Sequence, residues 1–277
     1  MTKGSRIAEG RTAEVFAWGD SQILKLFRSW CPASLAEQEA NAAQAVQRTG
    51  LSVPSVAGLI EVDGRPGIVF ERITGSSMFR EFPSRPWKLI HYARLLAELH
   101  TSMHTHQVSG LPSLRQRLER RIRSVTLSTR IKDATLSALD RLPDGHALCH
   151  GDFHPGNILM TSRGPVIVDW LDAAQGNPLA DVARTSLLAR VAELPPGTAR
   201  RWVFQSARTL FHRIYLRRYL ERHRASRGEL DAWLLPVAVA RVSEDIPAER
   251  RRLAALIDML LRRRQRGNIS TNSGLTV

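Results

Sequence analysis

The sequence predicts an α+β protein with two lobes, a small antiparallel β-sheet followed by a mainly helical region. Residues 1–74 alternate short apolar runs with glycine-containing turns, which is typical of strands. Most of the remaining chain has apolar residues at helical spacing, and Gly75-Ser76-Ser77 separates the two patterns. With 43% hydrophobic and 24% charged residues over 277 positions, the composition is that of a folded globular chain, neither disordered nor fibrous.

The N-terminal part predicts four strands and one helix. Gly19-Asp20-Ser21 separates the first two strands and is typical of a hairpin turn. The Ala-rich run from Pro32 to Arg48 has no internal glycine or proline and precedes Gly50, so it predicts a helix. Strands are predicted at 11–18, 22–27, 56–62 and 67–72.

The C-terminal part predicts helices, interrupted by a return to short strands. Helices are predicted at 87–103, 114–125, 131–142, 179–193, 197–224, 229–243 and 248–264, and strands at 146–149, 158–160 and 166–168. We therefore expect residues 1–74 to form an N-terminal lobe, residues 75–264 a helical C-terminal lobe, and residues 265–277 a frayed polar tail.

Positive charge is concentrated in the C-terminal helices. The chain carries 40 basic and 26 acidic side chains, a net charge of +14. Residues 190–277 have 18 basic and eight acidic side chains, whereas residues 142–189 have two basic and five acidic ones. The arginine-rich helices leave nucleic-acid binding open as an alternative function. No recognised nucleic-acid-binding motif accompanies them, so a nucleic-acid partner is not expected.

Several classes of protein are disfavoured by what the sequence lacks. No apolar run approaches the ~20 residues needed to span a bilayer. The first residues lack the apolar region of a secretory signal. Cys31 and Cys149 make neither a disulfide framework nor a metal-ligand spacing. We expect a cytoplasmic protein without a membrane partner.

The residues that suggest chemistry lie in HGDFHPGNIL at 150–159 and VIVDW at 166–170. Asp152 and Asn157 stand five positions apart in a loop, and Asp169 follows a short apolar strand, where a rigid scaffold can present a carboxylate. Their oxygens are the ligands that Mg²⁺ prefers when it bridges nucleotide phosphates. A carboxylate that accepts a hydroxyl proton completes the requirements of phosphoryl transfer. A single Asp or Asn is more often a turn former, but here all these features coincide.

This pattern resembles the aminoglycoside phosphotransferase and choline kinase-like family, which has a protein-kinase-like fold. In that family HGDxxxxN is the catalytic loop, and an Asp followed by Trp or Phe binds metal. The resemblance implies that Asp152 is the catalytic base, that His150 supports its loop, and that Asn157 and Asp169 bind Mg²⁺. It spans about residues 5–265. GNPLADVA at 176–183 resembles a further family signature, in which Asp181 is a structural carboxylate.

A lysine in the N-terminal part supports the same interpretation. Lys25 lies in a predicted strand between Leu24 and Leu26, so its side chain points opposite to both. A lysine there can reach nucleotide phosphates as a point charge, although a solvated strand lysine is the alternative. The resemblance implies a glutamate partner on the following helix, either Glu39, which we favour, or Glu37.

The resemblance also implies main-chain contacts to the nucleotide. IAEGRTAEVF at 7–16 stands in the place of the phosphate-covering loop, with Gly10 and Thr12 as the contacts. It has one glycine where protein kinases have three, and an ordinary hairpin is an equal alternative. IVFERITG at 68–75 resembles the hinge, where main-chain groups of Glu71 and Ile73 would bond the purine edge.

Together these features predict an ATP- and Mg²⁺-dependent enzyme that phosphorylates a hydroxyl group of a small molecule. The acceptor is left open among antibiotics, amino-alcohols and sugars. The basic C-terminal helices argue mildly against a strongly cationic acceptor such as an aminoglycoside. A nucleotide-binding pseudokinase or adaptor is a further alternative, which the presence of all four key residues, Lys25, Asp152, Asn157 and Asp169, disfavours.

Overall fold

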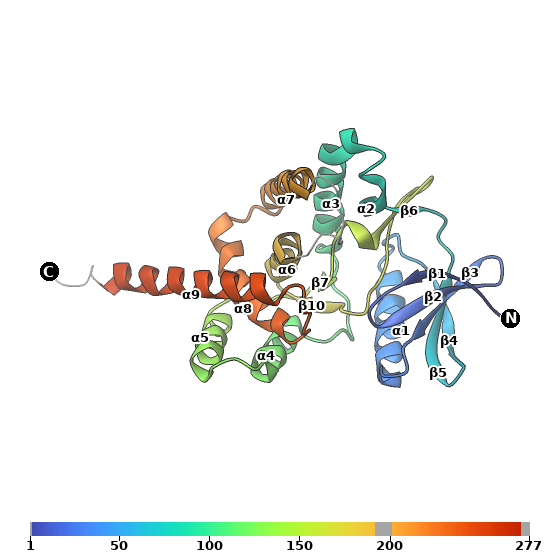
Figure 1. Cartoon of the computed structure of the whole chain (residues 1–277), viewed down its shortest axis with the longest axis horizontal. Coiled ribbons are helices and arrows are strands. Elements are labelled where there is room, and N and C mark those ends of the chain that lie inside the picture. Colours follow the sequence, from blue (N-terminus) through green and yellow to red (C-terminus); the bar gives the residue numbers. More distant parts are fainter. Residues whose placement is uncertain (1, 192–200, 273–277) are drawn as a thin grey trace. The chain divides into compact units, whose positions relative to one another are not determined.

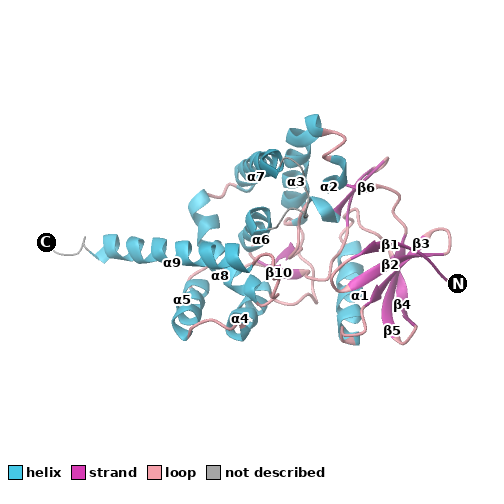
Figure 2. Ribbon diagram, in the orientation of Figure 1, coloured by secondary structure: helices cyan, strands magenta, loops and turns pink. Residues whose placement is uncertain are grey.

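The computed structural model describes residues 2–191 and 201–272, and the contacts within the chain divide it into two compact units. The first unit combines Met1–Lys88, Thr105–Leu111 and His150–Ala174. The second combines Leu89–His104, Pro112–Cys149 and Gln175–Val277. Strands are concentrated in the first unit and helices in the second (Figure 2). The loop that begins at His150 therefore belongs to the same unit as the N-terminal sheet, although 54 residues of the second unit precede it in sequence.

A five-stranded antiparallel sheet with one helix against it forms the N-terminal part of the first unit (Figure 1). The strand order is β1-β2-β3-β5-β4. Leu24 and Leu26 of β3 are wholly buried and pack with Val69 of β5, because alternate residues of a strand face the same side. The elements are β1 (Lys3–Glu9), β2 (Ala13–Trp18), β3 (Gln22–Phe27), α1 (Ala33–Gln47), β4 (Val56–Val62) and β5 (Arg65–Glu71).

The predicted hairpin is confirmed, with Trp18 opposite Gln22 and Gly19 in the left-handed region at φ 62°. The predicted helix and the last two strands of this part are present within two residues of their expected limits. Strand β1 was not predicted. Every residue of β1 is exposed and it pairs along one edge with β2, so its sequence lacks the apolar alternation that a half-buried strand shows.

A small three-stranded sheet, in the order β6-β8-β9, completes the first unit. Gly75 precedes β6, and a Cβ atom there would lie 2.5 Å from the carbonyl oxygen of Met160 in β8. A glycine is therefore required for the backbone to approach β8 so closely. The elements are β6 (Ser76–Ser77), α2 (Met78–Glu81), β8 (Ile158–Thr161), β9 (Gly164–Ile167) and two short 3₁₀ helices, Pro86–Lys88 and Pro155–Asn157.

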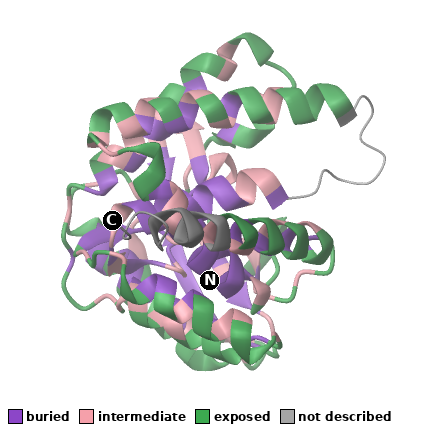
Figure 3. Ribbon diagram, turned by 90° about the vertical axis from the view of Figure 1, so that its left-hand side faces the viewer, coloured by how far each residue is buried: buried purple, intermediate pink, exposed green. Residues whose placement is uncertain are grey.

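The second unit is built around α8, which packs against α4, α5, α6 and α9. A capping box formed by Ser226 and Glu229 begins α8, and its residues from Trp233 to Arg241 are buried. Buried and exposed residues alternate along the helices of this unit (Figure 3). Its elements are α3 (Leu89–Met103), α4 (Leu114–Ser124), α5 (Thr129–Asp140), β7 (Ala147–Cys149), β10 (Ala174–Gly176), α6 (Pro178–Val191), α7 (Arg201–His223), α8 (Arg227–Val242) and α9 (Arg250–Asn272).

A fully hydrogen-bonded polar cluster, here called the Asp181 network, joins α3, α6 and α7. The Nε2 atoms of His100 and His104 lie 3.1 and 3.4 Å from Oδ2 of Asp181. Their Nδ1 atoms lie 2.7 Å from the hydroxyls of Tyr215 and Tyr219. A carboxylate only accepts, so each Nε2 donates to Asp181, and each neutral ring then accepts the tyrosine proton at Nδ1. This arrangement gives the buried polar atoms of these five side chains internal partners, as a stable core requires.

Two predicted segments extend into residues that the structure does not describe. The helix predicted at 197–224 begins there, and its described part, α7, starts at Arg201. Helix α9 continues beyond residue 264 to Asn272, and residues 273–277 of the predicted tail lie outside the described residues. Within 2–191 and 201–272, no helix is long and apolar enough to cross a bilayer.

Candidate active site

Lys25 binds two carboxylates of the first unit, and we call these three residues the lysine cluster. Its Nζ atom lies 2.6 Å from Oε1 of Glu39 on α1 and 2.8 Å from Oδ1 of Asp169. The alternation of β3 turns Lys25 away from Leu24 and Leu26, which are buried on the opposite face of the sheet. The cluster therefore brings together residues separated by 144 positions in sequence.

The second glutamate considered from sequence, Glu37, is exposed and takes no part in the lysine cluster. Glu39 lies on the buried face of α1. Ala36 precedes it by three positions, Ala40 is adjacent, Ala43 follows it by four positions, and all three are buried as well. The helix period therefore selects Glu39 as the partner of Lys25.

The charges of the lysine cluster are strongly coupled. Burial alone lowers the pKa of Lys25, but Asp169 and Glu39 outweigh this effect and raise it. Burial raises the pKa of Glu39 to about 7, against the opposing influence of Lys25. Oε2 of Glu39 is buried and has no hydrogen-bond partner among the described residues. The cluster therefore contains a carboxylate whose hydrogen-bonding capacity is incompletely used.

Asp169 presents an accessible carboxylate from a constrained backbone. Its φ is 69°, in the left-handed region that Asp and Asn tolerate better than most residues. The Lys25 ammonium lowers the pKa of Asp169, although burial opposes it. The lowered pKa keeps this carboxylate ionised. Because the Asp169 side chain is 44% exposed, a ligand can approach it.

His150 ties the predicted catalytic loop to the strand that precedes Asp169. Its wholly buried ring donates from Nε2 to the carbonyl oxygen of Val168, at 3.1 Å, and accepts at Nδ1 from the backbone N–H of Asp152, at 3.2 Å. The ring packs against Trp170 and Phe153 at centroid distances of 4.6 and 5.7 Å. His150 thus holds the two segments that carry the predicted carboxylates, as a positioning residue.

Gly151 allows the tight turn between His150 and Asp152. Its φ is 79°, and a Cβ atom there would lie 2.3 Å from the carbonyl oxygen of Asp172. Any larger residue would therefore displace the backbone on one side of the loop or the other. Gly151 had no predicted role, although a glycine beside a candidate catalytic residue is a signal for such a close approach.

Asp152 is partly accessible, with 31% of its side chain exposed. Its Oδ2 atom lies 3.4 Å from Nε2 of His154, whose Nδ1 accepts the backbone N–H of Gly156 at 3.0 Å. Because Nδ1 accepts, the neutral His154 ring carries its proton on Nε2, which faces Asp152. His154 was not predicted as a neighbour of the candidate base, although its position two residues after Asp152 was an available signal.

Asn157 connects both ends of the candidate metal-binding segment. Its side-chain Nδ2 donates to the main-chain carbonyl oxygen of Asp152 at 2.9 Å. The main-chain carbonyl oxygen of Asn157 accepts from the backbone N–H of Val168 at 3.0 Å. With the amide nitrogen engaged, Oδ1 remains as the atom that can bind a cation. Oδ1 of Asn157 and the ionised carboxylate of Asp169 are hard oxygen ligands, so this donor set fits Mg²⁺.

Gly10 and Thr12 form a turn that Arg28 braces. The Gly10 N–H donates to the carbonyl of Ala13 at 2.8 Å, which closes the turn between β1 and β2. The Arg28 backbone N–H binds the carbonyl of Thr12, and its guanidinium binds those of Gly10 and Arg11. In the described chain, Gly10 and Thr12 share no hydrogen bond with the lysine cluster, so the structure defines the turn and not a phosphate contact.

Glu71 is the last residue of β5, and Ile73 lies two positions further along the chain. The Glu71 carboxylate accepts from the backbone N–H and the hydroxyl of Ser55, at 3.3 and 3.2 Å, so its side chain fixes the end of the strand. The main-chain groups of Ile73 have no hydrogen-bond partner within the described residues. Ile73 therefore keeps the backbone donor and acceptor that a purine edge would need.

Comparison with known proteins identifies the fold and family. The profile of the phosphotransferase enzyme family matches residues 3–230. A choline/ethanolamine kinase family protein from Mesorhizobium loti is 20% identical and has a TM-score of 0.56, with 94% of this chain and 85% of that chain covered. A thermostable mutant of aminoglycoside phosphotransferase APH(4)-Ia, in a ternary complex with AMP-PNP and hygromycin B, is 16% identical and has a TM-score of 0.66, with 93% and 92% covered. No curated protein matches the chain in sequence.

A third similar structure is the amicoumacin kinase hAmiN in complex with AMP-PNP, Ca²⁺ and Ami, which is 15% identical and has a TM-score of 0.59, with 92% and 87% covered. At such identities these likenesses show the fold, and they confirm the α+β, protein-kinase-like class predicted from the sequence. The family profile matches most of the chain and confirms the resemblance seen in the catalytic-loop motif. This protein therefore belongs to the phosphotransferase enzyme family.

Proposed function

We propose that this protein is an ATP- and Mg²⁺-dependent kinase that transfers the γ-phosphoryl group of ATP to a hydroxyl of a small molecule. The main observation in support is the lysine cluster, in which Lys25 contacts both Glu39 and Asp169. A lysine held between a helix glutamate and a metal-binding Asp is the arrangement that phosphoryl transfer by kinase-like enzymes requires. In this proposal residues 1–74 bind the nucleotide, and residues 75–264 supply the catalytic loop and the acceptor site.

Each residue of the site has a chemical task in this proposal. Lys25 binds the α- and β-phosphates as a point charge, and Glu39 orients its ammonium group. Oδ1 of Asn157 and the Asp169 carboxylate would hold Mg²⁺, which neutralises charge on the phosphate oxygens when it is bound. Main-chain groups of Glu71 and Ile73 would bind the purine, and the turn at Gly10 and Thr12 would cover the phosphates.

Asp152 is assigned as the base that accepts the proton of the acceptor hydroxyl. The acceptor oxygen attacks the γ-phosphorus, the bond from that phosphorus to the β,γ-bridging oxygen breaks, and ADP leaves. The oxygen–hydrogen bond of the acceptor breaks in the same step, and its proton passes to the Asp152 carboxylate. His150 fixes the Asp152 backbone through the 3.2 Å hydrogen bond at Nδ1. Nε2 of His154 lies 3.4 Å from Oδ2 of Asp152, and in this proposal it helps to orient this carboxylate toward the acceptor.

The acceptor belongs to a broad class. Similar structures carry hygromycin B or Ami together with a nucleotide analogue, which supports a small-molecule acceptor. Antibiotics, amino-alcohols and sugars each present a hydroxyl of the required kind. A nucleotide-binding pseudokinase and a basic nucleic-acid-binding protein are the alternatives that the test must separate.

The test is a screen for ATP consumption with Mg²⁺ over aminoglycosides, macrolides, choline, amino-alcohols and sugars. On the best acceptor, Asp152→Ala is expected to lower kcat by about 10³-fold, within the contribution of a general base, while the Kd for MgATP changes less than threefold. The control Asp144→Asn removes one negative charge from an exposed carboxylate that contacts Arg115, and it should retain activity.

Three outcomes would contradict the proposal. ATP binding without turnover on any acceptor would favour the pseudokinase. Full turnover by Asp152→Ala would remove the base assignment. Steeply salt-dependent binding of DNA or RNA that survives Asp152→Ala, without ATP binding, would favour the nucleic-acid-binding alternative.

A further inference from the structure

A cavity of about 310 Å³ lies in the second unit among the end of α6, the beginning of α8 and the middle of α9. It shares no residue with the candidate active site, which belongs to the first unit. We call it the arginine cavity. Its lining residues are Arg190, Arg227, Asp231, Ala232, Leu234, Leu235, Leu260, Arg263 and Arg264.

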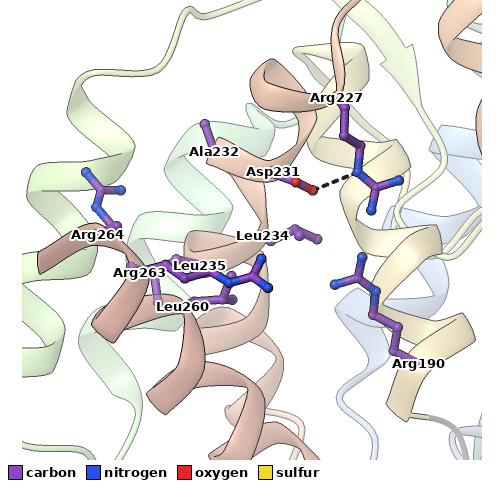
Figure 4. A pocket seen from close by; sticks show the side chains of 9 residues that line it. All are labelled: Arg190, Arg227, Asp231, Ala232, Leu234, Leu235, Leu260, Arg263 and Arg264. Carbon is purple, nitrogen blue, oxygen red and sulfur yellow. Dashed lines mark hydrogen bonds and ion pairs between the residues drawn. The ribbon is translucent and has the colours of Figure 1, made fainter. Parts of the chain in front are cut away.

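The arginine cavity has a large excess of positive charge. Four arginines and one aspartate line it, a formal charge of +3. The guanidinium groups of Arg190, Arg227 and Arg263 converge, whereas the side chain of Arg264 points away (Figure 4). Arg227 contacts Asp231 at 3.0 Å. Arg190 and Arg263 have no hydrogen-bond or ion-pair partner within the described chain.

The convergence of like charges is unfavourable in the absence of a counter-ion. Burial lowers the pKa of Arg190, and Arg227 and Arg263 lower it further, while Asp231 only partly compensates. Arg227 is moreover the first residue of α8, where the helix macrodipole disfavours a cation and favours an anion. Both effects would be reversed by an anion bound between the three guanidinium groups.

His212 on α7 is affected by the charges of Arg190 and Arg227, although it is not among the residues that line the cavity. Its Nε2 atom is buried and has no hydrogen-bond partner among the described residues. Burial lowers the pKa of His212 to about 4, and the neighbouring Arg190 and Arg227 contribute. An ordinary structural histidine in the core has partners on both nitrogens, as His100 and His104 do.

We propose that the arginine cavity binds a phosphorylated small molecule. Guanidinium groups match phosphate oxygens in geometry and bind them in pairs of hydrogen bonds. The three converging guanidinium groups and Asp231 give a charge of +2, which suits a group with two negative charges better than a single carboxylate. The side chains of Leu234, Leu235 and Leu260 would contact an apolar part of the ligand. A nucleic-acid backbone requires a row of exposed cations along a face, whereas these three groups converge in a concave site.

Calorimetric titration tests the proposal with inorganic phosphate, pyrophosphate and phenyl phosphate, without Mg²⁺ and at an ionic strength held constant with NaCl. We expect phenyl phosphate to bind more tightly than inorganic phosphate, because its ring can contact the leucines. Arg190→Gln and Arg263→Gln should each weaken its binding by about tenfold, the loss of one charge-assisted contact. The control Arg262→Gln removes an exposed neighbour that pairs with Asp258, and it should change the Kd less than twofold.

Lys25→Met distinguishes the arginine cavity from the nucleotide site. Binding of phenyl phosphate that persists in Lys25→Met supports the proposal, and its loss overturns it. Failure of all three anions to bind the wild type, or equal weakening by Arg190→Gln and Arg262→Gln, also overturns it. If duplex DNA displaces phenyl phosphate, and if Arg190→Gln and Arg262→Gln weaken DNA binding equally, the positive charge of this region serves nucleic-acid binding instead.

Two further measurements do not depend on activity. Without ligand, Arg190→Gln should leave Tm unchanged or raise it, because one of three repelling charges is removed. A fall of Tm in Arg190→Gln, together with no rise of the wild-type Tm when phenyl phosphate is added, would make Arg190 a structural residue and overturn the proposal. Binding of phenyl phosphate should raise the pKa of His212, followed by NMR of its ring, and an unchanged pKa would contradict a ligand between Arg190 and Arg227.

Discussion

The lysine cluster and the Asp181 network are two groups of buried charge that the fold completes to different degrees. In the Asp181 network both histidines bind the carboxylate on one side and a tyrosine hydroxyl on the other. In the lysine cluster Oε2 of Glu39 has no partner among the described residues. Asp169 is also partly open to solvent, whereas Asp181 is wholly buried.

This difference distinguishes a structural network from a candidate site. Hydrogen bonds from His100 and His104 outweigh burial and hold the pKa of Asp181 well below its usual range, so this charge stabilises the folded state. Burial raises the pKa of Glu39 instead, which makes its ionisation a cost to the folded state. We therefore expect substitutions in the lysine cluster to impair activity and those in the Asp181 network to impair stability.

The largest expected effect is that of Asp169→Asn on turnover. The variant keeps the size of the side chain and tolerates the positive φ, but it removes the charge that Lys25 and a metal ion would bind. We expect kcat/KM to fall at least about 10³-fold, which corresponds to about 4 kcal/mol. Steady-state kinetics and urea unfolding should show lost activity with stability changed by less than about 1 kcal/mol. A large loss of stability would instead group Asp169 with Asp181.

Asp181→Asn is expected to have the next largest effect, on stability. Removing one partner of a buried charged network typically costs about 3 kcal/mol, which urea unfolding at pH 7 measures. The folded-state pKa of Asp181 is depressed, so its contribution is present above its unfolded value near 3.9 and is lost as pH falls toward the lower folded value. Stability of the variant should therefore fall less steeply below pH 4. An effect no larger than that of the exposed-site variant Asp144→Asn would contradict this assignment.

Glu39→Gln is expected to change how stability depends on pH. The folded-state pKa near 7 exceeds the unfolded value near 4.3, so the folded protein binds the extra proton between these values. Stability from this group is complete below about pH 4.3 and is lost as pH rises through 7. Urea unfolding from pH 5 to 8 should show a decline on the order of 2 kcal/mol in the wild type that is reduced in Glu39→Gln. The exposed-site variant Glu37→Gln should behave as the wild type, and identical curves for all three proteins would refute the coupling.

The smallest expected effect is that of Tyr219→Phe. It removes the hydroxyl that binds Nδ1 of His104 and keeps the ring that stacks on His223. Loss of one buried hydrogen bond should cost about 1 kcal/mol of unfolding free energy. A loss above about 3 kcal/mol would show that the Asp181 network acts as a cooperative unit, and double substitution with His104→Gln would then measure the coupling.

Much of the fold could be predicted because it follows from local patterns. The helix at 33–47 agrees with its Ala-rich run without internal glycine or proline, and the hairpin around Gly19 agrees with its turn residues. Strand β1 could not be predicted, because an exposed edge strand leaves no apolar period in the sequence. The sequence likewise carried no sign that Glu244 is largely buried, because a charge at a helix end is usually solvated. Its carboxylate nevertheless pairs with Arg184 at 2.7 Å and with Arg121 at 3.4 Å.

The candidate site was predictable where residues stand close in sequence. The spacing of Asp152 and Asn157 and the strand before Asp169 predicted the loop and suggested its chemistry. The contact of His154 with Asp152 depends on the turn at Pro155–Asn157, which the sequence pattern alone did not define. The choice between Glu37 and Glu39 depended on which face of α1 meets the sheet.

The sequence by itself determined the class of fold and the family, because these are encoded in periodicity and short spacings, and it predicted the residues that we propose for phosphoryl transfer. The tertiary structure decided which charges meet. It brings Lys25 to Asp169 and leaves Arg190, Arg227 and Arg263 facing one another without a sufficient counter-charge. Such pairings join distant segments, and their energies depend on distance and burial, which no local pattern in the chain specifies.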